Sequence, residues 1–240
     1  MSASGCTVQG VNPRLVGVVP VRAGSRGLPG KNTRLLRGKP LYRHAVDLAL
    51  NAGLGEVWIT TDIEEILTAP LPARVRLRRR PADLADDHTQ MADVLGDFVD
   101  VLEGPATIIL LQATTPMRQP EQVEDAVARF VASGAELLMS VVEAPRESLK
   151  WGTVDDGWFS PMRSADHTFS NRQDLPDVVK PNGAIYVFDA DWFRARRTLA
   201  TERILAFEMD AETSIDIDTI RDFERAEQLL DERESVNENR

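Results

Sequence analysis

Residues 15–32, LVGVVPVRAGSRGLPGKN, join an apolar run to a turn whose residue types suit an anion. The β-branched residues between Leu15 and Val19 favour a strand, and Pro20 interrupts its backbone pairing. Glycines in such a turn let backbone N–H groups approach an anion closely, and nearby cations add full charge. The pattern predicts a phosphate-binding loop. Its candidate ligands are Arg22, Gly24, Ser25 and Lys31, whereas Arg26 and Arg34 are expected to be surface charges.

An ordinary Gly/Pro turn with surface cations would have a similar composition, so the loop alone leaves both interpretations open. The glycine spacing does exclude two familiar phosphate loops. A P-loop requires G-x-x-x-x-G-K-[ST], but here five residues separate Gly24 from Gly30, and Asn32 follows Lys31. The dinucleotide pattern G-x-G-x-x-G also fails, because these glycines recur at every third residue.

A pair of acidic residues near the other end of the chain could complete such a site. Asp216 and Asp218 alternate with Ile215 and Ile217. On a strand over 214–218, both carboxylates would point to one face and both isoleucines to the core. Adjacent carboxylates repel unless a cation bridges them, and hard oxygen ligands suit Mg²⁺ or Mn²⁺ together with substrate phosphates. The alternative is that both acids only cap the helix that follows.

The elements expected to position these residues alternate between strand and helix. Short apolar runs predict strands at 15–19, 57–60, 73–77, 107–111, 136–142, 184–188 and 214–218. Apolar residues at helical spacing predict helices at 40–52, 63–67, 91–102, 120–131 and 220–230. This order predicts an α/β fold with three layers and a mostly parallel central sheet. Ligands bind at the carboxyl ends of such strands, which is where Gln112 would lie.

The alternation breaks over 143–181, which is rich in Pro, Asp, Ser, Arg and aromatic residues. A long excursion of this kind is usually functional, such as a lid or a dimer arm. Trp151 and Trp158, each taken singly, are also explained by packing within a hairpin. The predicted organisation is a flexible arm, a first part of the main domain, this excursion, a return to the main domain and a charged tail, at 1–13, 14–142, 143–181, 182–231 and 232–240 respectively.

Composition limits the classes of function. The chain has 240 residues, with 28 basic and 38 acidic side chains and a net charge of −10, which argues against a nucleic-acid partner. Cys6 is the single cysteine, so no disulfide scaffold can form. No run of apolar residues reaches the length of a membrane helix, and the N-terminus lacks the apolar region of a signal peptide. We expect a cytoplasmic protein without a membrane partner.

Ordered signatures from about Leu15 to Leu230 resemble the CMP-sialic acid synthetase family (acylneuraminate cytidylyltransferases). They are RAGSRGLPGKN from Arg22, TTD from Thr60, RPADLA from Arg80, LQATTPMR from Leu111, RQDLP from Arg172, PNGAIY from Pro181 and SIDIDT from Ser214. The resemblance implies a Rossmann-like nucleotidyltransferase fold with a small dimerisation arm, and a homodimer. It implies that 14–142 is the nucleotide-binding part of a catalytic domain, that 143–181 is a dimerisation and sugar-binding excursion, and that 182–231 returns to the catalytic domain. It implies transfer of CMP from CTP to the anomeric hydroxyl of a sialic acid, with release of pyrophosphate and with Mg²⁺, or Mn²⁺, as cofactor.

The same resemblance implies roles for individual residues. Arg22, Ser25 and Lys31 would hold phosphates, with Gly24 in the same loop, and Arg22, Lys31 and Asp218 would act in catalysis. Asn32 and Arg80, with the backbone near Thr89, would face cytosine and ribose. Asp216 and Asp218 would carry the metal. The sugar would meet Gln112, Lys150, Arg172 and Tyr186.

The chain departs from the family pattern at several positions. Ala113 and Thr115 stand where the family usually has Pro and Ser, and residues 86–90 carry His88 and Gln90 where small hydroxyl residues are common. The base contacts after Arg80 are therefore left open. The same reaction on legionaminic, pseudaminic or 3-deoxy-octulosonic acid is an alternative, as is a nucleotide-binding relative without catalysis.

Overall fold

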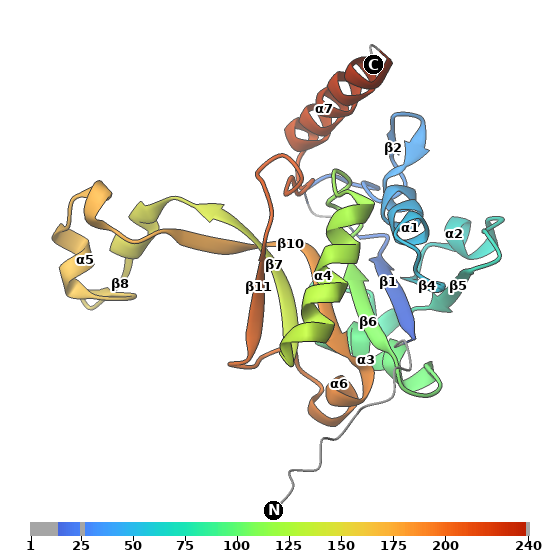
Figure 1. The fold of residues 1–240 in the computed structure, drawn as a ribbon, viewed down its shortest axis with the longest axis horizontal. Helices are drawn as coiled ribbons and strands as arrows, with labels where there is room; N and C mark the ends of the chain where they lie inside the picture. Colours follow the sequence, from blue (N-terminus) through green and yellow to red (C-terminus); the bar gives the residue numbers. More distant parts are fainter. Residues whose placement is uncertain (1–13, 25–26, 239–240) are drawn as a thin grey trace, which may run out of the picture.

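A computed structural model describes residues 14–24 and 27–238 of the chain. Seven strands form one central sheet in the order β11-β7-β10-β6-β1-β4-β5 (Figure 1). In chain order they are β1 (Leu15–Val21), β4 (Glu56–Thr61), β5 (Val75–Arg79), β6 (Thr107–Leu111), β7 (Leu137–Ala144), β10 (Val178–Asp189) and β11 (Ile204–Glu208). Strand β10 runs antiparallel to both neighbours, β6 and β7, and the other paired strands are parallel. The predicted α/β fold with a mostly parallel sheet is confirmed.

Helices cover both faces of this sheet and make the three layers. The helices α1 (Leu41–Asn51), α2 (Glu64–Thr68) and α4 (Pro120–Ser133) contribute to the core on one face. The helices α3 (Met91–Val101) and α6 (Ala190–Arg196) contribute to the core on the other face. Central strand β6 is buried along its whole length because Ile109 and Leu111 enter the first core while Ile108 and Leu110 enter the second.

The phosphate-loop region continues from β1 into compact turns. A two-residue hairpin, β2 (Leu35–Leu36) with β3 (Lys39–Pro40), precedes α1. The 3₁₀ turn η1 (Ala82–Leu84) follows β5 and leads toward α3. The described residues between β1 and β2, those after β5 and those after β6 thus gather at the carboxyl edge of neighbouring parallel strands, where ligands bind in open α/β sheets.

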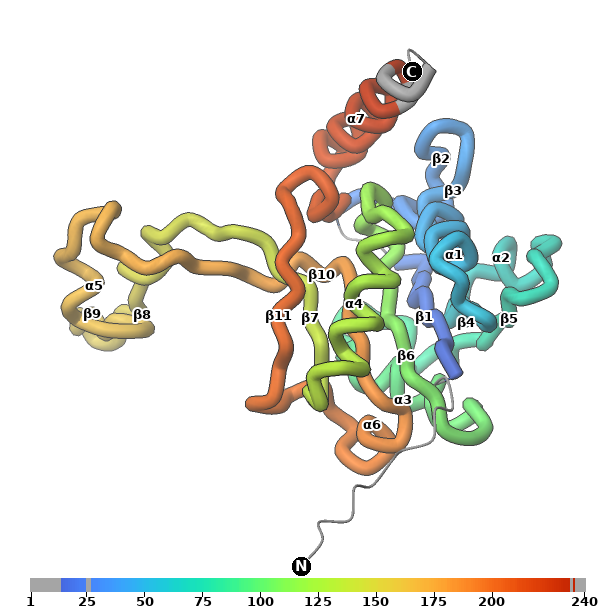
Figure 2. Tube along the Cα trace, viewed as in Figure 1, coloured from blue at the N-terminus to red at the C-terminus, as the bar shows by residue number. Residues whose placement is uncertain are grey.

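Between β7 and β10 the chain leaves the body as a projecting arm, seen at the left of Figure 1 and again in Figure 2. The arm holds η2 (Arg146–Lys150), β8 (Gly152–Asp155), β9 (Trp158–Pro161), α5 (Ala165–Phe169) and η3 (Arg172–Asp174). The hairpin of β8 and β9 turns at Asp156 and Gly157, both with positive φ. Trp151 and Trp158 remain exposed, so packing within the hairpin does not account for them.

The last helix, α7 (Ile220–Glu238), is longer than predicted and continues through residues expected to fray. Its Phe223, Ala226 and Leu229 pack with Leu28, Leu36, Leu41, Met117 and Ile217 in a third cluster. The segment before it is not the predicted strand: residues 215–218 have no sheet partner. Apolar and acidic residues alternate here because Ile217 packs into this cluster while Asp216 and Asp218 are exposed to solvent. Strand β11, which was not predicted, forms the edge of the sheet next to β7.

The predicted flexible arm 1–13, Cys6 and the phosphate ligand Ser25 lie outside the described residues. In the part of the chain that the structure describes, no helix has both the length and the apolar character needed to cross a membrane.

Candidate active site

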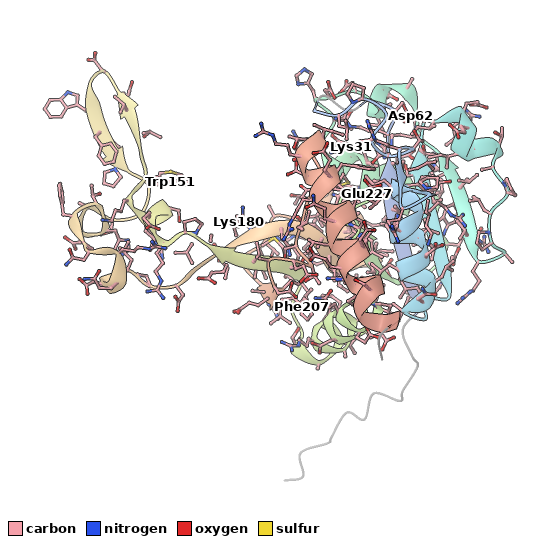
Figure 3. The ribbon with its side chains drawn as sticks, turned by 90° about the horizontal axis from the view of Figure 1, so that it is seen from above. Lys31, Asp62, Trp151, Lys180, Phe207 and Glu227 are labelled. Carbon is pink, nitrogen blue, oxygen red and sulfur yellow. The ribbon has the colours of Figure 1, made fainter. Side chains whose placement is uncertain are left out.

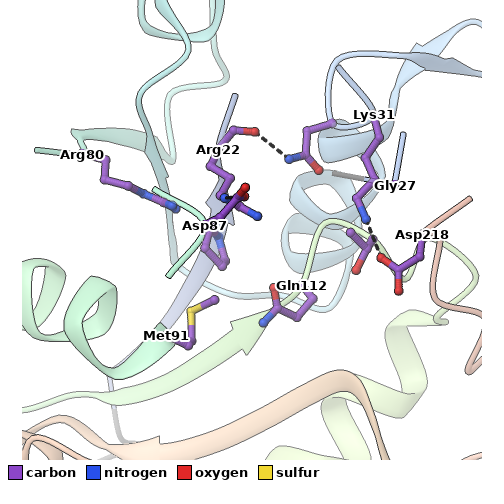
Figure 4. Close-up of a pocket in the computed structure, with 11 residues that line it drawn as sticks. Arg22, Gly27, Lys31, Arg80, Asp87, Met91, Gln112 and Asp218 are labelled. Carbon is purple, nitrogen blue, oxygen red and sulfur yellow. Dashed lines mark hydrogen bonds and ion pairs between the residues drawn. The ribbon is translucent and has the colours of Figure 1, made fainter. Parts of the chain in front are cut away.

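A polar cavity of about 300 Å³ opens at the carboxyl edge of the sheet (Figure 4). Its lining comes from both halves of the chain: the end of β1, the loop before β2, the turn after β6 and the segment before α7. The lining residues are Pro20, Arg22, Gly27, Lys31, Asn32, Arg80, Asp87, Met91, Gln112, Thr114 and Asp218. The structure thus brings together most of the residues predicted to hold a nucleotide.

Lys31 joins the glycine-rich loop to the acidic segment. Its Nζ lies 2.8 Å from Asp218 Oδ1 and donates to the Ile217 carbonyl at 2.6 Å. Gly27 makes a second close approach, because a Cβ there would lie 2.3 Å from the Asp218 carbonyl oxygen. A side chain at position 27 would therefore force loop and acidic segment apart. Lys31 and Asp218 are 187 positions apart in sequence, yet their side chains are in contact.

Hydrogen bonds fix the backbone around Arg22, and the Arg22 side chain forms an ion pair and a hydrogen bond of its own. Its carbonyl accepts a hydrogen bond from Asn32 Nδ2 at 2.9 Å, and the next residue's N–H donates to Asp62 Oδ1 at 2.9 Å. Its Nη1 contacts Asp87 Oδ1 at 2.5 Å and the Asp86 carbonyl at 3.2 Å. The guanidinium therefore faces the cavity from a fixed backbone.

Asn32 and Arg80 are buried polar residues that line the cavity. Arg80 Nη2 donates to the Thr60 carbonyl at 3.1 Å, while Arg80 Nε and Asn32 Oδ1 have no partner among the described residues. Burial lowers the pKa of Arg80. Buried polar atoms without partners are uncommon and need an explanation, and a polar ligand in the cavity would supply one.

Two predicted nucleotide contacts lie beside the cavity without lining it. Gly24 is exposed, and a Cβ there would come within 3.6 Å of Arg22 Nη1. Thr89 donates through its N–H and its hydroxyl to Asp86 Oδ1, at 2.7 and 2.9 Å. Thr89 therefore shapes the loop that carries Asp87.

A second recess, of about 440 Å³, adjoins the base of the arm and includes Tyr186, Asn182 and Asp216. Burial raises the pKa of Tyr186, and the Asp216 carboxylate adds to this. The Asp216 side chain is solvent-exposed overall, yet the protein atoms around its carboxylate raise its pKa, as does Asp218, against a lowering by a hydrogen bond with Thr114. The two aspartates therefore serve different hollows: Asp218 lines the first cavity and Asp216 the second.

Two buried residues form hydrogen bonds to segments that line the first cavity and the second recess. The sequence analysis assigned no role to either residue. Arg118 donates to the Gln112 carbonyl at 2.6 Å and to the Ala184 carbonyl, and burial lowers its pKa to about 9. Asn182 accepts from Ser140 Oγ at 2.6 Å and donates to Ser214 Oγ at 2.8 Å. Both lie inside the LQATTPMR and PNGAIY signatures, which was the available signal.

The acidic pair fits a magnesium ion only in part. Within residues 14–24 and 27–238, no group of three or more His, Cys, Asp or Glu side chains could hold a metal. Mg²⁺, however, is usually bound by one or two carboxylates together with water and substrate phosphates. Asp218, which lines the first cavity, meets part of that requirement, and Asp216 two residues earlier is near enough in sequence to add a second carboxylate although it lines the other recess. In this structure the Asp218 carboxylate is paired with Lys31.

Lys150 and Arg172, predicted to meet the sugar, belong to η2 and η3 of the arm and do not line the cavity. The arm projects away from the α/β body (Figures 1 and 3). Lys150 Nζ donates to the Ser170 carbonyl at 2.5 Å, and Arg172 Nε lies 2.9 Å from Glu147 Oε1. Within one chain these residues do not join Gln112 or Tyr186.

The fold and the cavity together define a three-layer α/β protein with a basic, ligand-sized hollow at the carboxyl edge of its sheet. The family described as Cytidylyltransferase matches residues 16–239, so this chain belongs to the cytidylyltransferase family.

Three known proteins illustrate the likeness. An N-acylneuraminate cytidylyltransferase of Streptococcus agalactiae is 30% identical over 86% of this chain and 51% of its own length. A CMP-N,N'-diacetyllegionaminic acid synthase of Legionella pneumophila is 32% identical over 91% of this chain and 97% of its own. A solved CMP:2-keto-3-deoxy-manno-octonic acid synthetase complexed with CTP superposes with a TM-score of 0.70 and 23% identity, covering 92% of this chain and 99% of that one. This chain spans about half the length of the N-acylneuraminate cytidylyltransferases that it matches.

Proposed function

We propose that this protein transfers CMP from CTP to the anomeric hydroxyl of a sialic acid and releases pyrophosphate. One observation carries the proposal: Lys31 and Gly27 of the first loop contact Ile217 and Asp218 of the acidic segment across one cavity. A nucleotide triphosphate needs cations, backbone N–H groups and carboxylates for a metal in one place. The family match and the names of the relatives support the same reaction.

In the proposed reaction the sugar hydroxyl oxygen attacks the α-phosphorus of CTP. A new O–P bond forms, the bond to the β-phosphate oxygen breaks, and pyrophosphate leaves. Negative charge develops on the phosphate oxygens, so catalysis depends on positioning and on fixed positive charge. Arg22 and Lys31 supply that charge from opposite sides of the cavity.

The remaining polar groups of the cavity are proposed to bind the nucleoside. Asn32 Oδ1 and Arg80 Nε, which lack partners in the described structure, are suitable hydrogen-bonding groups for cytosine and ribose. Gln112 would contact the sugar from the end of β6, and Tyr186 would line the sugar recess beside Asp216. The proton of the attacking hydroxyl would pass to one of the two aspartates, with Asp218 nearest to Lys31.

Magnesium would be held by Asp216 and Asp218 together with the triphosphate. When bound, it supplies charge that stabilises the phosphate oxygens and the leaving pyrophosphate. The protein's own part is to present the two carboxylates on a segment fixed by the Ile217 N–H, which donates to the Thr114 carbonyl at 2.8 Å.

We further propose that the arm pairs with a second copy of the chain. Its exposed apolar side chains support this, and Lys150 and Arg172 would then reach a sugar bound in the other copy. A homodimer would account for a sugar-binding set that one chain does not assemble.

A legionaminic acid derivative is the second candidate sugar. The legionaminic acid synthase matches at 32% identity and over nearly its whole length, whereas the sialic acid enzymes extend well beyond this chain. Sugar pockets built from loops vary freely on one fold, so the choice requires measurement.

The test is to incubate the protein with CTP, Mg²⁺ and a panel of N-acetylneuraminic, legionaminic, pseudaminic and 3-deoxy-octulosonic acids, and to measure pyrophosphate. Release with N-acetylneuraminic acid above the others supports the first proposal, and a preference for legionaminic acid supports the second. Absence of release with every sugar would refute catalysis and leave a nucleotide-binding protein.

A further inference from the structure

Arg22 already has an anionic partner inside the cavity that we propose for the triphosphate. The Asp87 carboxylate lies 2.5 Å from Arg22 Nη1, and both side chains line the cavity. Each side chain is about one-third exposed, at 32% and 31%, so solvent reaches the pair. Figure 4 shows the two residues close together in the cavity lining. A phosphate that binds Arg22 must take the place of this carboxylate.

The loop that carries Asp87 is fixed before any ligand arrives. Asp86 Oδ1 accepts hydrogen bonds from the His88 N–H at 2.7 Å, the Thr89 N–H at 2.7 Å and the Thr89 hydroxyl at 2.9 Å. The Asp86 carbonyl also accepts from Arg22. Asp87 is thus presented to Arg22 by a turn that its neighbour stabilises, and little side-chain freedom is lost when the pair forms.

The backbone of Arg22 is held by groups other than Asp87. Asn32 donates to the Arg22 carbonyl and Asp62 accepts from the Ala23 N–H, whereas the guanidinium contacts Asp87 and the Asp86 carbonyl. As Arg22 is paired with Asp87, so Lys31 is paired with the Asp218 carboxylate. Both lining cations that face the proposed phosphate path are therefore neutralised by carboxylates, so a weakly charged anion gains little by replacing either one.

We propose that Asp87 is a specificity-determining residue: it competes with bound anions for Arg22 and so favours a triphosphate chain over shorter phosphates. The inference rests on the proposed function, because it assumes that phosphate binds in this cavity. A triphosphate chain is long enough to reach Lys31 as well as Arg22, and this second contact offsets the displacement of Asp87. Pyrophosphate, the product, has fewer, so competition by Asp87 also favours its release.

The experiment measures binding of inorganic pyrophosphate, inorganic tripolyphosphate and CTP to the full chain by calorimetry. Asp87→Asn removes the competing charge and keeps the shape. We expect pyrophosphate to bind about threefold to tenfold tighter, as suits a partly exposed ion pair, and tripolyphosphate and CTP to gain less. The matched control is Asp83→Asn, which removes an exposed charge outside the cavity on the same connection. It should leave the ratio of affinities unchanged.

Two further variants separate competition from a general charge effect. In an Arg22→Gln background, Asp87→Asn should give no more gain than Asp83→Asn, and Asp87→Glu should restore the wild-type selectivity. Equal or weaker pyrophosphate binding by Asp87→Asn would overturn the proposal, because Asp87 would then be aiding Arg22. Failure of the proposed function is recognised separately, since it appears as missing pyrophosphate release with sugars while these binding constants are still measured.

Discussion

The α/β body buries its apolar side chains, whereas the arm leaves large ones exposed to solvent. In the body, β6 is buried on both faces and its residues enter two separate cores. In the arm, the large apolar side chains point to solvent, with Phe169 exposed by 90% and Trp158 by 79%. Exposed apolar groups of this size mark interaction surfaces. The difference suggests that one chain completes the body and its first cavity, whereas the arm needs a surface from outside this chain.

The largest expected effect tests whether the body holds the chemistry. Asp218→Asn removes the carboxylate beside Lys31 with little change in packing. We expect kcat for pyrophosphate release to fall by about 10²–10⁴, as for loss of a group that accepts the proton of the attacking hydroxyl and helps to hold the metal, with Tm almost unchanged. Asp155→Asn, an exposed carboxylate in the arm hairpin, is the control and should keep full activity. Full activity of Asp218→Asn would exclude a role in metal binding.

The next effect compares a buried amide of the body with an exposed one of the arm. Asn182→Ala removes the acceptor of the Ser140 hydroxyl and of the Ala184 N–H in a buried site, while Ser140 Oγ still accepts from the Ile185 N–H. We expect a loss of about 2–3 kcal/mol in the free energy of unfolding, measured with urea. Asn171→Ala, which removes an exposed bond to Asp174, should cost under about 0.5 kcal/mol. Similar losses in both variants would remove the contrast between the two regions.

A third effect concerns the apolar surface of the arm. Phe169→Ser should weaken self-association by at least about tenfold, because burial of one phenylalanine contributes on the order of 1.5–3 kcal/mol. Sedimentation equilibrium gives the dissociation constant, and urea unfolding of the body should be unchanged. Val131→Ser removes an exposed apolar residue of α4 and should leave association intact. A wild-type protein that stays monomeric at all concentrations would contradict the proposed pairing.

The smallest effect is an acid sensitivity of the body. Burial lowers the pKa of His44, whose Nε2 lies 3.0 Å from the Leu36 carbonyl. The unfolded chain then binds more protons, so stability falls as pH drops through the unfolded value near about 6.5 and levels off below the folded pKa. His44→Gln should reduce the stability loss between pH 7.5 and 5.5 by up to about 1 kcal/mol. An identical loss in variant and wild type would show that His44 is not the source.

Most of the body could be predicted because periodic burial leaves a direct trace in sequence. The uninterrupted apolar run of β6 and the helical spacing in α3 and α4 gave the right elements with small shifts at their ends. The segment 214–218 was misassigned for a physical reason. Its alternation matches a strand, but its backbone bonds go to Thr114 and Lys31 rather than to a neighbouring strand. An alternation of apolar and polar residues shows which side of a segment is buried. It does not show which group accepts or donates the segment's backbone hydrogen bonds.

The parts of the candidate site are recognisable from residue types and spacing: a basic glycine-rich turn after a first strand, a polar turn after the buried strand β6, and two aspartates before the last helix. How these parts meet depends on the folding of distant segments against one another. Gly27 and Lys31 contact Asp218, whereas Asp216 lines the other recess. The Asp87 carboxylate forms an ion pair with Arg22. These contacts depend on loops whose backbone hydrogen bonds are satisfied by distant side chains, and local residue patterns carry no record of such partners.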